Sequence, residues 1–324
     1  MKISFLGNNG ILKSINNKIK CNNNSTCTSS PKLEIPSDSY TFSLRKDLST
    51  QDSATLCEYE HYFYNEPEEF NSNLAKLDDE EFLHTVDLLS GEHSRTIPFL
   101  EMDEQNIDRL ASLSMEQFNA TAKSYDLYQN NVFHLADADT CEFVMRYLEQ
   151  DEINYGLAST NVMGFNPVNK SMFQADKLQL FCDNLESDNI SKAMRTRDGM
   201  WSCPFYACKI DEFEIMLERL EPSHADELAL WASEQGDNKN VLVDLEPDKL
   251  RLLVAKMSPE CLEVLCRKQN LYGATPMHMQ TTEFVEMFAF KLPKDSLREV
   301  IEIENGWWAK PSQRTDVDFS KYLK

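Results

Sequence analysis

The stretch Asn270-Leu-Tyr-Gly-Ala-Thr-Pro-Met-His-Met279 decides the fold. It opens as a turn, because Gly273 permits the positive backbone φ angles that other residues avoid. It closes as the start of a helix, because proline suits the first helical position, where its missing N–H is not needed. Weaker copies of this stretch lie upstream, and we call the residues equivalent to Pro276, together with Pro276 itself, the marker positions. The five upstream marker positions are Pro98, Val132, Pro167, Pro204 and Val241.

The marker positions are evenly spaced, with steps of 34, 35, 37, 37 and 35 residues. A fixed period of this length is the sequence signature of a repeat architecture. After each marker position comes an amphipathic stretch such as Leu250–Val254, and then a second helix with its own start signal. The clearest start signal is Ser258 as the N-cap followed by Pro259 at the first helical position. Each period is therefore predicted to contain two helices of about 10–12 residues and a tight connector.

The periodic pattern resembles the ankyrin repeat family, in which N-x-x-G-x-T-P-L-H opens each repeat. The resemblance covers residues 92–306 and implies an all-α solenoid of about six two-helix ankyrin-like repeats, each of roughly 35 residues. It also implies that Thr275, His278 and His134 hydrogen-bond backbone groups of the connectors. Only the last period carries the full signature, so the β-hairpin fingers of ankyrins are expected to be short or absent. Divergent repeats of this kind resemble those of ankyrin-like bacterial secreted effector proteins.

The N-terminal part differs from the periodic part. Residues 1–40 are rich in Asn, Ser and Thr, and residues 1–32 carry five lysines and no acidic residue. With so few core-forming residues, this leader is predicted to be disordered. It is either a plain flexible terminus or a secretion signal, because it resembles the acid-free leaders that bacterial secretion systems read. Residues 41–91 are predicted to form a short helical capping segment, with two short helices over 66–77 and 78–89.

Residues 307–324 are predicted to form a C-terminal capping tail. The adjacent Trp307 and Trp308 have two readings. Either they cover the apolar end of the repeat array, or they form an exposed anchor, because tryptophan is favoured in binding hot spots. Together with Trp201, these tryptophans are the predicted partner-binding residues.

The charge of the chain limits its partners. The sequence has 54 acidic and 32 basic residues, a formal net charge of −22. Such a surface repels nucleic acid phosphates and anionic membranes. No apolar run reaches the 18–20 residues that a membrane span needs, so no integral membrane contact is expected. The predicted partner is a host protein or another protein, and the predicted location is the host cytoplasm after secretion, or otherwise the cytoplasm. The oligomeric state does not follow from the sequence.

Catalytic and metal-binding patterns are absent from the sequence. The nine cysteines include no CxxC pair, and the closest pairs are five residues apart, which places two helical side chains on different faces. Mostly buried, reduced thiols are the expected state of these cysteines. There is no glycine-rich phosphate loop, GxSxG or HExxH motif. We therefore predict no catalytic, cofactor-binding or metal-binding residue, and no cofactor.

Two alternatives to a binding protein stay open. Cys57 and His61 are four residues apart, the spacing of a thiolate–imidazole pair on one helix face, so a thiol hydrolase or transferase could have its active residues in the first 90. The stretch from Ile35 to Cys57 resembles an F-box in Leu48–Asp52, although Ser53 departs from the pattern. That resemblance implies a ubiquitin-ligase adaptor with substrate-binding repeats. The favoured function is a non-enzymatic protein–protein interaction module, an effector that binds a host protein through its repeat surface.

Overall fold

Each marker position begins a short helix. The structure is a computed structural model that describes residues 48–91, 94, 96–172, 174–197, 202–235 and 239–324. These residues contain helices and no strand, which confirms the all-α prediction for this part of the chain. The short helices are η1 (Pro98–Leu100), α8 (Val132–Leu135), α11 (Pro167–Lys170), α14 (Pro204–Ala207), α17 (Val241–Asp244) and α20 (Pro276–Met279).

Two longer helices follow each short one. The first of each pair is α6 (Glu104–Leu113), α9 (Ala138–Met145), α12 (Ala175–Asn184), α15 (Ile210–Glu218), α18 (Pro247–Lys256) or α21 (Thr282–Lys291). The second is α7 (Met115–Ala122), α10 (Gln150–Ala158), α13 (Ser187–Arg195), α16 (Pro222–Ser233), α19 (Pro259–Arg267) or α22 (Lys294–Val300).

Each period thus holds one helix more than the sequence predicted, because the chain turns after the short helix. In the second period, Ala136 is extended, with φ −63° and ψ 158°. The next residue, Asp137, then caps α9 by accepting the Thr140 backbone N–H at 2.9 Å. A strong N-cap directly after four helical residues starts a new helix instead of extending the old one.

Three helices precede Pro98: α3 (Thr50–Asn65), α4 (Pro67–Leu74) and α5 (Asp79–Ser90). The last two correspond to the short helices predicted over 66–77 and 78–89. Helix α5 begins at a capping box. The Asp78 side chain accepts the Glu81 backbone N–H at 2.9 Å, and the Glu81 side chain accepts the Asp78 backbone N–H in return. After α22 come the turn η2 (Pro311–Gln313) and α23 (Ser320–Leu323).

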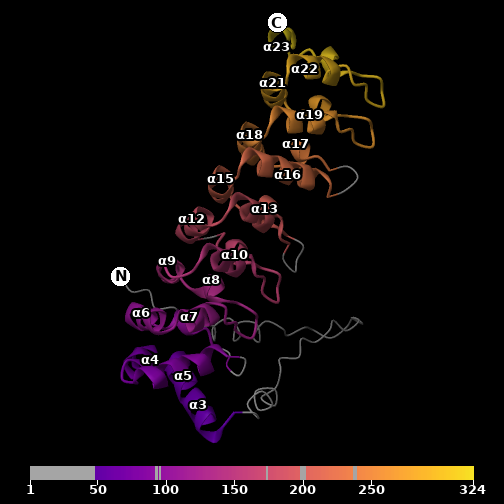
Figure 1. The fold of residues 1–324 in the computed structure, drawn as a ribbon. Coiled ribbons are helices and arrows are strands. Elements are labelled where there is room, and N and C mark those ends of the chain that lie inside the picture. Colours follow the sequence, from indigo (N-terminus) through magenta and orange to yellow (C-terminus); the bar gives the residue numbers. More distant parts are fainter. Residues whose placement is uncertain (1–47, 92–93, 95, 173, 198–201, 236–238) are drawn as a thin grey trace, which may run out of the picture. The chain divides into compact units, whose positions relative to one another are not determined.

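Helices one period apart pack against each other within Asp47–Lys324, which forms one compact unit. Among the first helices, α9, α12, α15 and α18 contact in series, and so do α10, α13, α16, α19 and α22 among the second helices (Figure 1). The residue after each marker position is an apolar side chain that is at most 1% exposed: Phe99, Phe133, Val168, Phe205, Leu242 and Met277. Among the described residues, no helix has both the length and the apolar character to span a bilayer.

Candidate partner-binding edge

Four connector loops share one hydrogen-bonded turn. They are the six residues before Val132, Pro167, Pro276 and Pro311, namely 126–131, 161–166, 270–275 and 305–310. In each, the side-chain oxygen of the first residue accepts the backbone N–H groups two and four residues later, at 2.8–3.0 Å. The N–H of that first residue bonds the carbonyl four residues on, at 2.9–3.0 Å. Asp and Asn favour this closed turn, because a short side chain reaches its own backbone. The first residues are Asp126, Asn161, Asn270 and Asn305.

One position of this turn has a left-handed backbone. All positive φ angles among the described residues fall three residues before Val132, Pro167, Pro276 or Pro311. Two of these residues are glycines, which adopt such angles readily, but the other two carry side chains that make the conformation unfavourable. The residues and their φ angles are Gln129 at 59°, Gly164 at 78°, Gly273 at 72° and Trp308 at 56°.

Pro311 therefore occupies a further position equivalent to the markers, 35 residues after Pro276. It falls within the C-terminal capping tail predicted over 307–324. The Asn305-Gly306 pair followed by Pro311 is the signal that would have identified it. Ser312, which follows Pro311, is exposed, whereas the equivalent residue after each earlier marker is buried and apolar.

The four connector loops expose apolar side chains at their tips. In each loop a pair of neighbouring residues is between 51% and 78% exposed. Exposed apolar residues gathered in one place mark interaction sites, whereas scattered ones need no explanation. We call these eight residues the apolar tips: Leu127 and Tyr128, Val162 and Met163, Leu271 and Tyr272, and Trp307 and Trp308.

Neighbouring tips are joined to each other through the backbone. The Val162 N–H donates to the Tyr128 carbonyl at 2.9 Å, and the Gly306 N–H donates to the Tyr272 carbonyl at 2.7 Å. The rings of Tyr272 and Trp307 stack with centroids 5.9 Å apart. A Cβ atom at Gly306 would lie only 2.9 Å from the Tyr272 carbonyl oxygen, so glycine permits this approach. The loops project on the side of the second helices (Figure 1).

Two of the three predicted partner-binding tryptophans lie among the described residues. Trp307 and Trp308 are exposed side chains of the last connector loop, so they do not cover the apolar end of the last period. Val317 and Phe319, both buried, extend the hydrophobic core there instead. Trp201 lies outside the described residues.

The connector histidines have structural contacts. The Nε2 atom of His134 lies 3.0 Å from the Phe165 carbonyl, and that of His278 lies 3.0 Å from the Ala309 carbonyl, each in the next connector loop. Because a carbonyl oxygen can only accept, Nε2 carries the proton in both rings. In each ring Nδ1 lies 3.1 Å from the N-cap backbone nitrogen that starts the same short helix. Burial lowers the pKa of His134 to about 4 and also lowers the pKa of His278.

Most thiols of the described residues are buried. Cys57 is exposed on α3, and the His61 ring lies 3.3 Å from the Asn65 amide and 3.6 Å from the Glu66 carboxylate. Burial raises the pKa of four other thiols to about 12, so that they stay protonated at neutral pH. These four are Cys141, Cys182, Cys208 and Cys261. Within the described residues, no group of three or more His, Cys, Asp or Glu side chains is placed to hold a metal ion.

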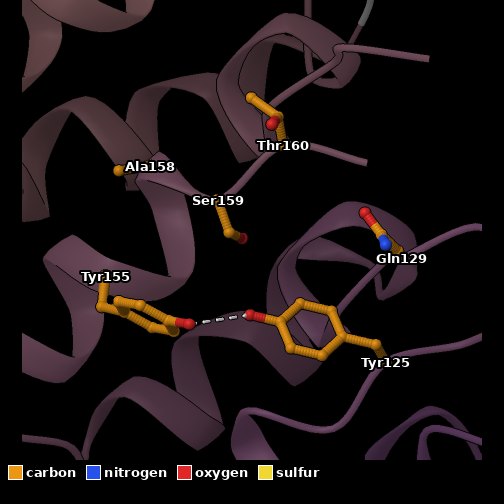
Figure 2. Close-up of a pocket in the computed structure, with 6 residues that line it drawn as sticks. All are labelled: Tyr125, Gln129, Tyr155, Ala158, Ser159 and Thr160. Carbon is orange, nitrogen blue, oxygen red and sulfur yellow. Dashed lines mark hydrogen bonds between the residues drawn. The ribbon is translucent and has the colours of Figure 1, made fainter. Parts of the chain in front are cut away.

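A pocket of about 610 Å³ lies beside the tips of the first two connector loops, 126–131 and 161–166 (Figure 2). Two tyrosines form one side of it, with the Tyr125 hydroxyl donating to the Tyr155 hydroxyl at 3.3 Å. The remaining lining residues are Gln129, Ala158, Ser159 and Thr160.

Comparison with known proteins found no match: no protein-family model, no curated protein and no solved structure is similar to this chain. Function is therefore inferred from the apolar tips and the residues beside them.

Proposed function

We propose that this chain is an ankyrin-like helical-repeat protein that binds another protein through its apolar tips and carries out no catalysis. The proposal is supported by the period of 34–37 residues between marker positions and by the connector turn that recurs at one register. Packing between helices one period apart is what a solenoid requires, because each repeat buries its apolar face only against its neighbours.

Trp308 is the observation that carries the binding proposal. Its backbone φ of 56° is strained for a residue with a side chain, and its ring is 78% exposed. Glycine at this position would relieve the strain, as it does at Gly164 and Gly273. A polar side chain would remove the exposed apolar surface. A residue that opposes folding in both ways is explained by binding, since burying such a ring in a partner gains about 2–3 kcal/mol.

Secretion as a bacterial effector and a host protein as the partner remain predictions, because the leader that suggested them, residues 1–40, lies outside the described residues. The F-box resemblance stays a prediction too: its core, Leu48–Asp52, leads into α3, and the part before Leu48 lies outside the described residues. Thiol catalysis by Cys57 and His61 also stays a prediction.

The test compares partner capture by three full-length proteins. The tip variant carries Leu271→Ser, Tyr272→Ser, Trp307→Ser and Trp308→Gly. The control variant carries Val264→Ser and Phe290→Ser, which remove exposed apolar side chains from α19 and α21. We expect a protein that the wild type and the control variant capture and the tip variant loses, with at least a tenfold weaker affinity once that partner is purified.

This result can be interpreted only if the tip variant is folded. Its thermal unfolding midpoint should equal or exceed that of the wild type, because Trp308→Gly relieves the positive φ. A partner captured equally well by the tip variant and the wild type would overturn the proposal.

A further inference from the structure

The pocket beside the first two tips has aromatic and uncharged walls. Tyr155 is 54% exposed, and its ring and that of Tyr125 border the same space (Figure 2). Ser159 and Thr160 lie across this space from the two hydroxyls, and Gln129 closes one side of it. A volume of about 610 Å³ is in the range of sites that hold a small ligand or a few residues of a peptide.

The charged side chains on the two segments that line the pocket already have partners. Segments 119–131 and 155–166 contain only two charged residues, Lys123 and Asp126. The Lys123 ammonium bonds the Glu152 carboxylate at 2.6 Å and lies 5.7 Å from the centre of the Tyr155 ring. The Asp126 carboxylate accepts N–H groups of its own loop and the Asn130 amide, each at 2.8 Å. Within these two segments no cation is left to hold an anionic ligand, and the net charge of −22 repels one.

Three polar groups of the pocket can still donate a hydrogen bond to a ligand, whereas the Ser159 hydroxyl already donates to the Gly156 carbonyl at 2.8 Å. These three groups are the Tyr155 hydroxyl, the Thr160 hydroxyl and the side-chain amide of Gln129. Among the described residues their only hydrogen bond is the one that Tyr155 accepts from Tyr125. A suitable ligand offers carbonyl oxygens to these donors and flat apolar groups to the two rings. An amphipathic helix bonds its own carbonyls internally. A polyproline II segment leaves its carbonyls free and presents pyrrolidine rings, which dock against aromatic side chains.

An acidic side chain stands next to this surface. Asp151 is exposed on α10 one turn before Tyr155, on the same helix face, and has no ion-pair partner among the described residues. A Lys or Arg beside a proline-rich segment would complement this charge.

We propose that the pocket binds a proline-rich segment of the partner protein that is flanked by Lys or Arg. The inference rests on the proposed function, since it names the kind of segment that the partner protein would place in this pocket. It adds a second contact region, lined by Tyr125 and Tyr155, to the apolar tips.

Synthetic peptides test this proposal with the full-length protein. The probe is a fluorescent peptide of ten prolines followed by two arginines, and the comparison peptides replace the prolines by glycine and serine or the arginines by glutamates. Anisotropy titration should show at least tenfold tighter binding of the proline–arginine peptide than of the glycine–serine peptide. The glutamate peptide should bind more weakly than the arginine peptide, and Asp151→Asn should reduce that difference.

Variants locate the binding. Tyr155→Ala should weaken binding of the proline–arginine peptide at least tenfold, and Tyr155→Phe, which keeps the ring, about threefold. Tyr64→Ala, which removes a similarly exposed tyrosine from α3, should leave it unchanged. Equal affinities for the proline–arginine and glycine–serine peptides, or a Tyr155→Ala variant that binds like the wild type, would overturn the proposal. Preferential binding of an apolar helical peptide at Tyr155 would overturn it as well.

The outcome is separable from that of the proposed function. The tip variant of the previous section should still bind the proline–arginine peptide, because its changes lie in the loops at 270–275 and 305–310. If the tip variant loses the partner but no proline peptide binds the wild type, only the pocket proposal fails. If the proline peptide binds at Tyr155 but the tip variant keeps every partner, the tips are not the binding surface.

Discussion

His134 and His278 each connect a short helix to the connector loop of the following period. The imidazole suits this place because one ring nitrogen bonds within its own N-cap while the other reaches the next carbonyl, 31 residues later. Both contacts use the neutral ring, and burial disfavours the charged form. A neutral, buried histidine makes the folded state sensitive to acid, since the unfolded chain takes up the proton more readily.

His134 should make the protein less stable as the pH falls. Its pKa is about 4 in the folded protein and near 6.5 in the unfolded chain. The stability that this residue contributes is complete above pH 6.5 and is lost between pH 6.5 and 4. At pH 5 the loss relative to pH 7.5 should be about 2 kcal/mol. Urea unfolding of the wild type and of His134→Gln at both pH values checks this, and the variant should lose correspondingly less stability in acid.

The control for this measurement is His61→Gln, which removes an exposed imidazole from α3. It should follow the wild type, because His61 makes no contact between periods among the bonds described. An equal loss of stability in acid for wild type and His134→Gln would show that His134 does not cause the sensitivity.

The short helices depend on neighbouring periods to bond their last carbonyls. A helix of four residues leaves its carbonyls without intrahelical partners. Long side chains from the next period supply donors. Lys177 bonds the Ala136 carbonyl at 2.6 Å, and Lys249 bonds the Tyr206 carbonyl at 3.0 Å. Arg314 donates to the Met277 carbonyl of α20 at 3.1 Å and to the Gln280 carbonyl, just after α20, at 2.8 Å. The short helices α8, α14 and α20 are therefore each stabilised by a side chain that follows the bonded carbonyl by 34–43 residues.

Helix α10 packs closely on α8 because Gly156 has no side chain. A Cβ atom there would lie 2.5 Å from the Phe133 ring, which is fully packed. Gly156→Ala should destabilise the protein by about 1–3 kcal/mol through this overlap. Helix propensity alone favours alanine by about 1 kcal/mol, so the two effects predict opposite signs. Chemical denaturation of the variant decides between them.

The matched control is a double-mutant cycle with Phe133→Leu. In the Phe133→Leu background, Gly156→Ala should cost much less than in the wild type, because the ring is no longer there. If Gly156→Ala stabilises the wild-type protein, the Phe133 ring of α8 does not lie as close to Gly156 of α10 as described.

Acidic residues outnumber basic residues by 54 to 32 across the molecule. Such an excess destabilises a folded chain by self-repulsion. Exposed ion pairs between periods oppose this effect, for example Arg251–Glu283 at 2.9 Å and Arg267–Glu299 at 2.6 Å. Pairs of this exposure contribute little each, so repulsion should dominate.

Salt should therefore stabilise the protein. Raising NaCl from 20 to 500 mM shortens the screening length and should raise the midpoint of thermal unfolding by about 2–5 °C. Replacing the exposed Glu68 and Glu80 by Gln should raise the midpoint at low salt and reduce its rise with salt. A midpoint that falls as salt is added would show that the ion pairs between periods outweigh the repulsion.

The sequence by itself determined the all-helical class, the period of the marker positions and most helix starts. Those signals are local: Gly273 sets a turn, Pro276 begins a helix, and Ser258 caps α19 through atoms within three residues. The short helices were not predicted as separate elements, because Ala136 and its equivalents carry no local stop signal. Four of them, α8, α14, α17 and α20, end where the backbone becomes extended before the next helix.

Only the tertiary structure decided which residues form the candidate site. Whether Trp307 and Trp308 cover the core or stand in solvent depends on what packs over the last period, and Val317 and Phe319 do so instead. The pocket was not predicted from the sequence, since Tyr125 and Tyr155 are 30 residues apart and meet only when successive periods stack. Exposure and cavities arise from contacts between periods, and no local signal in the chain encodes them.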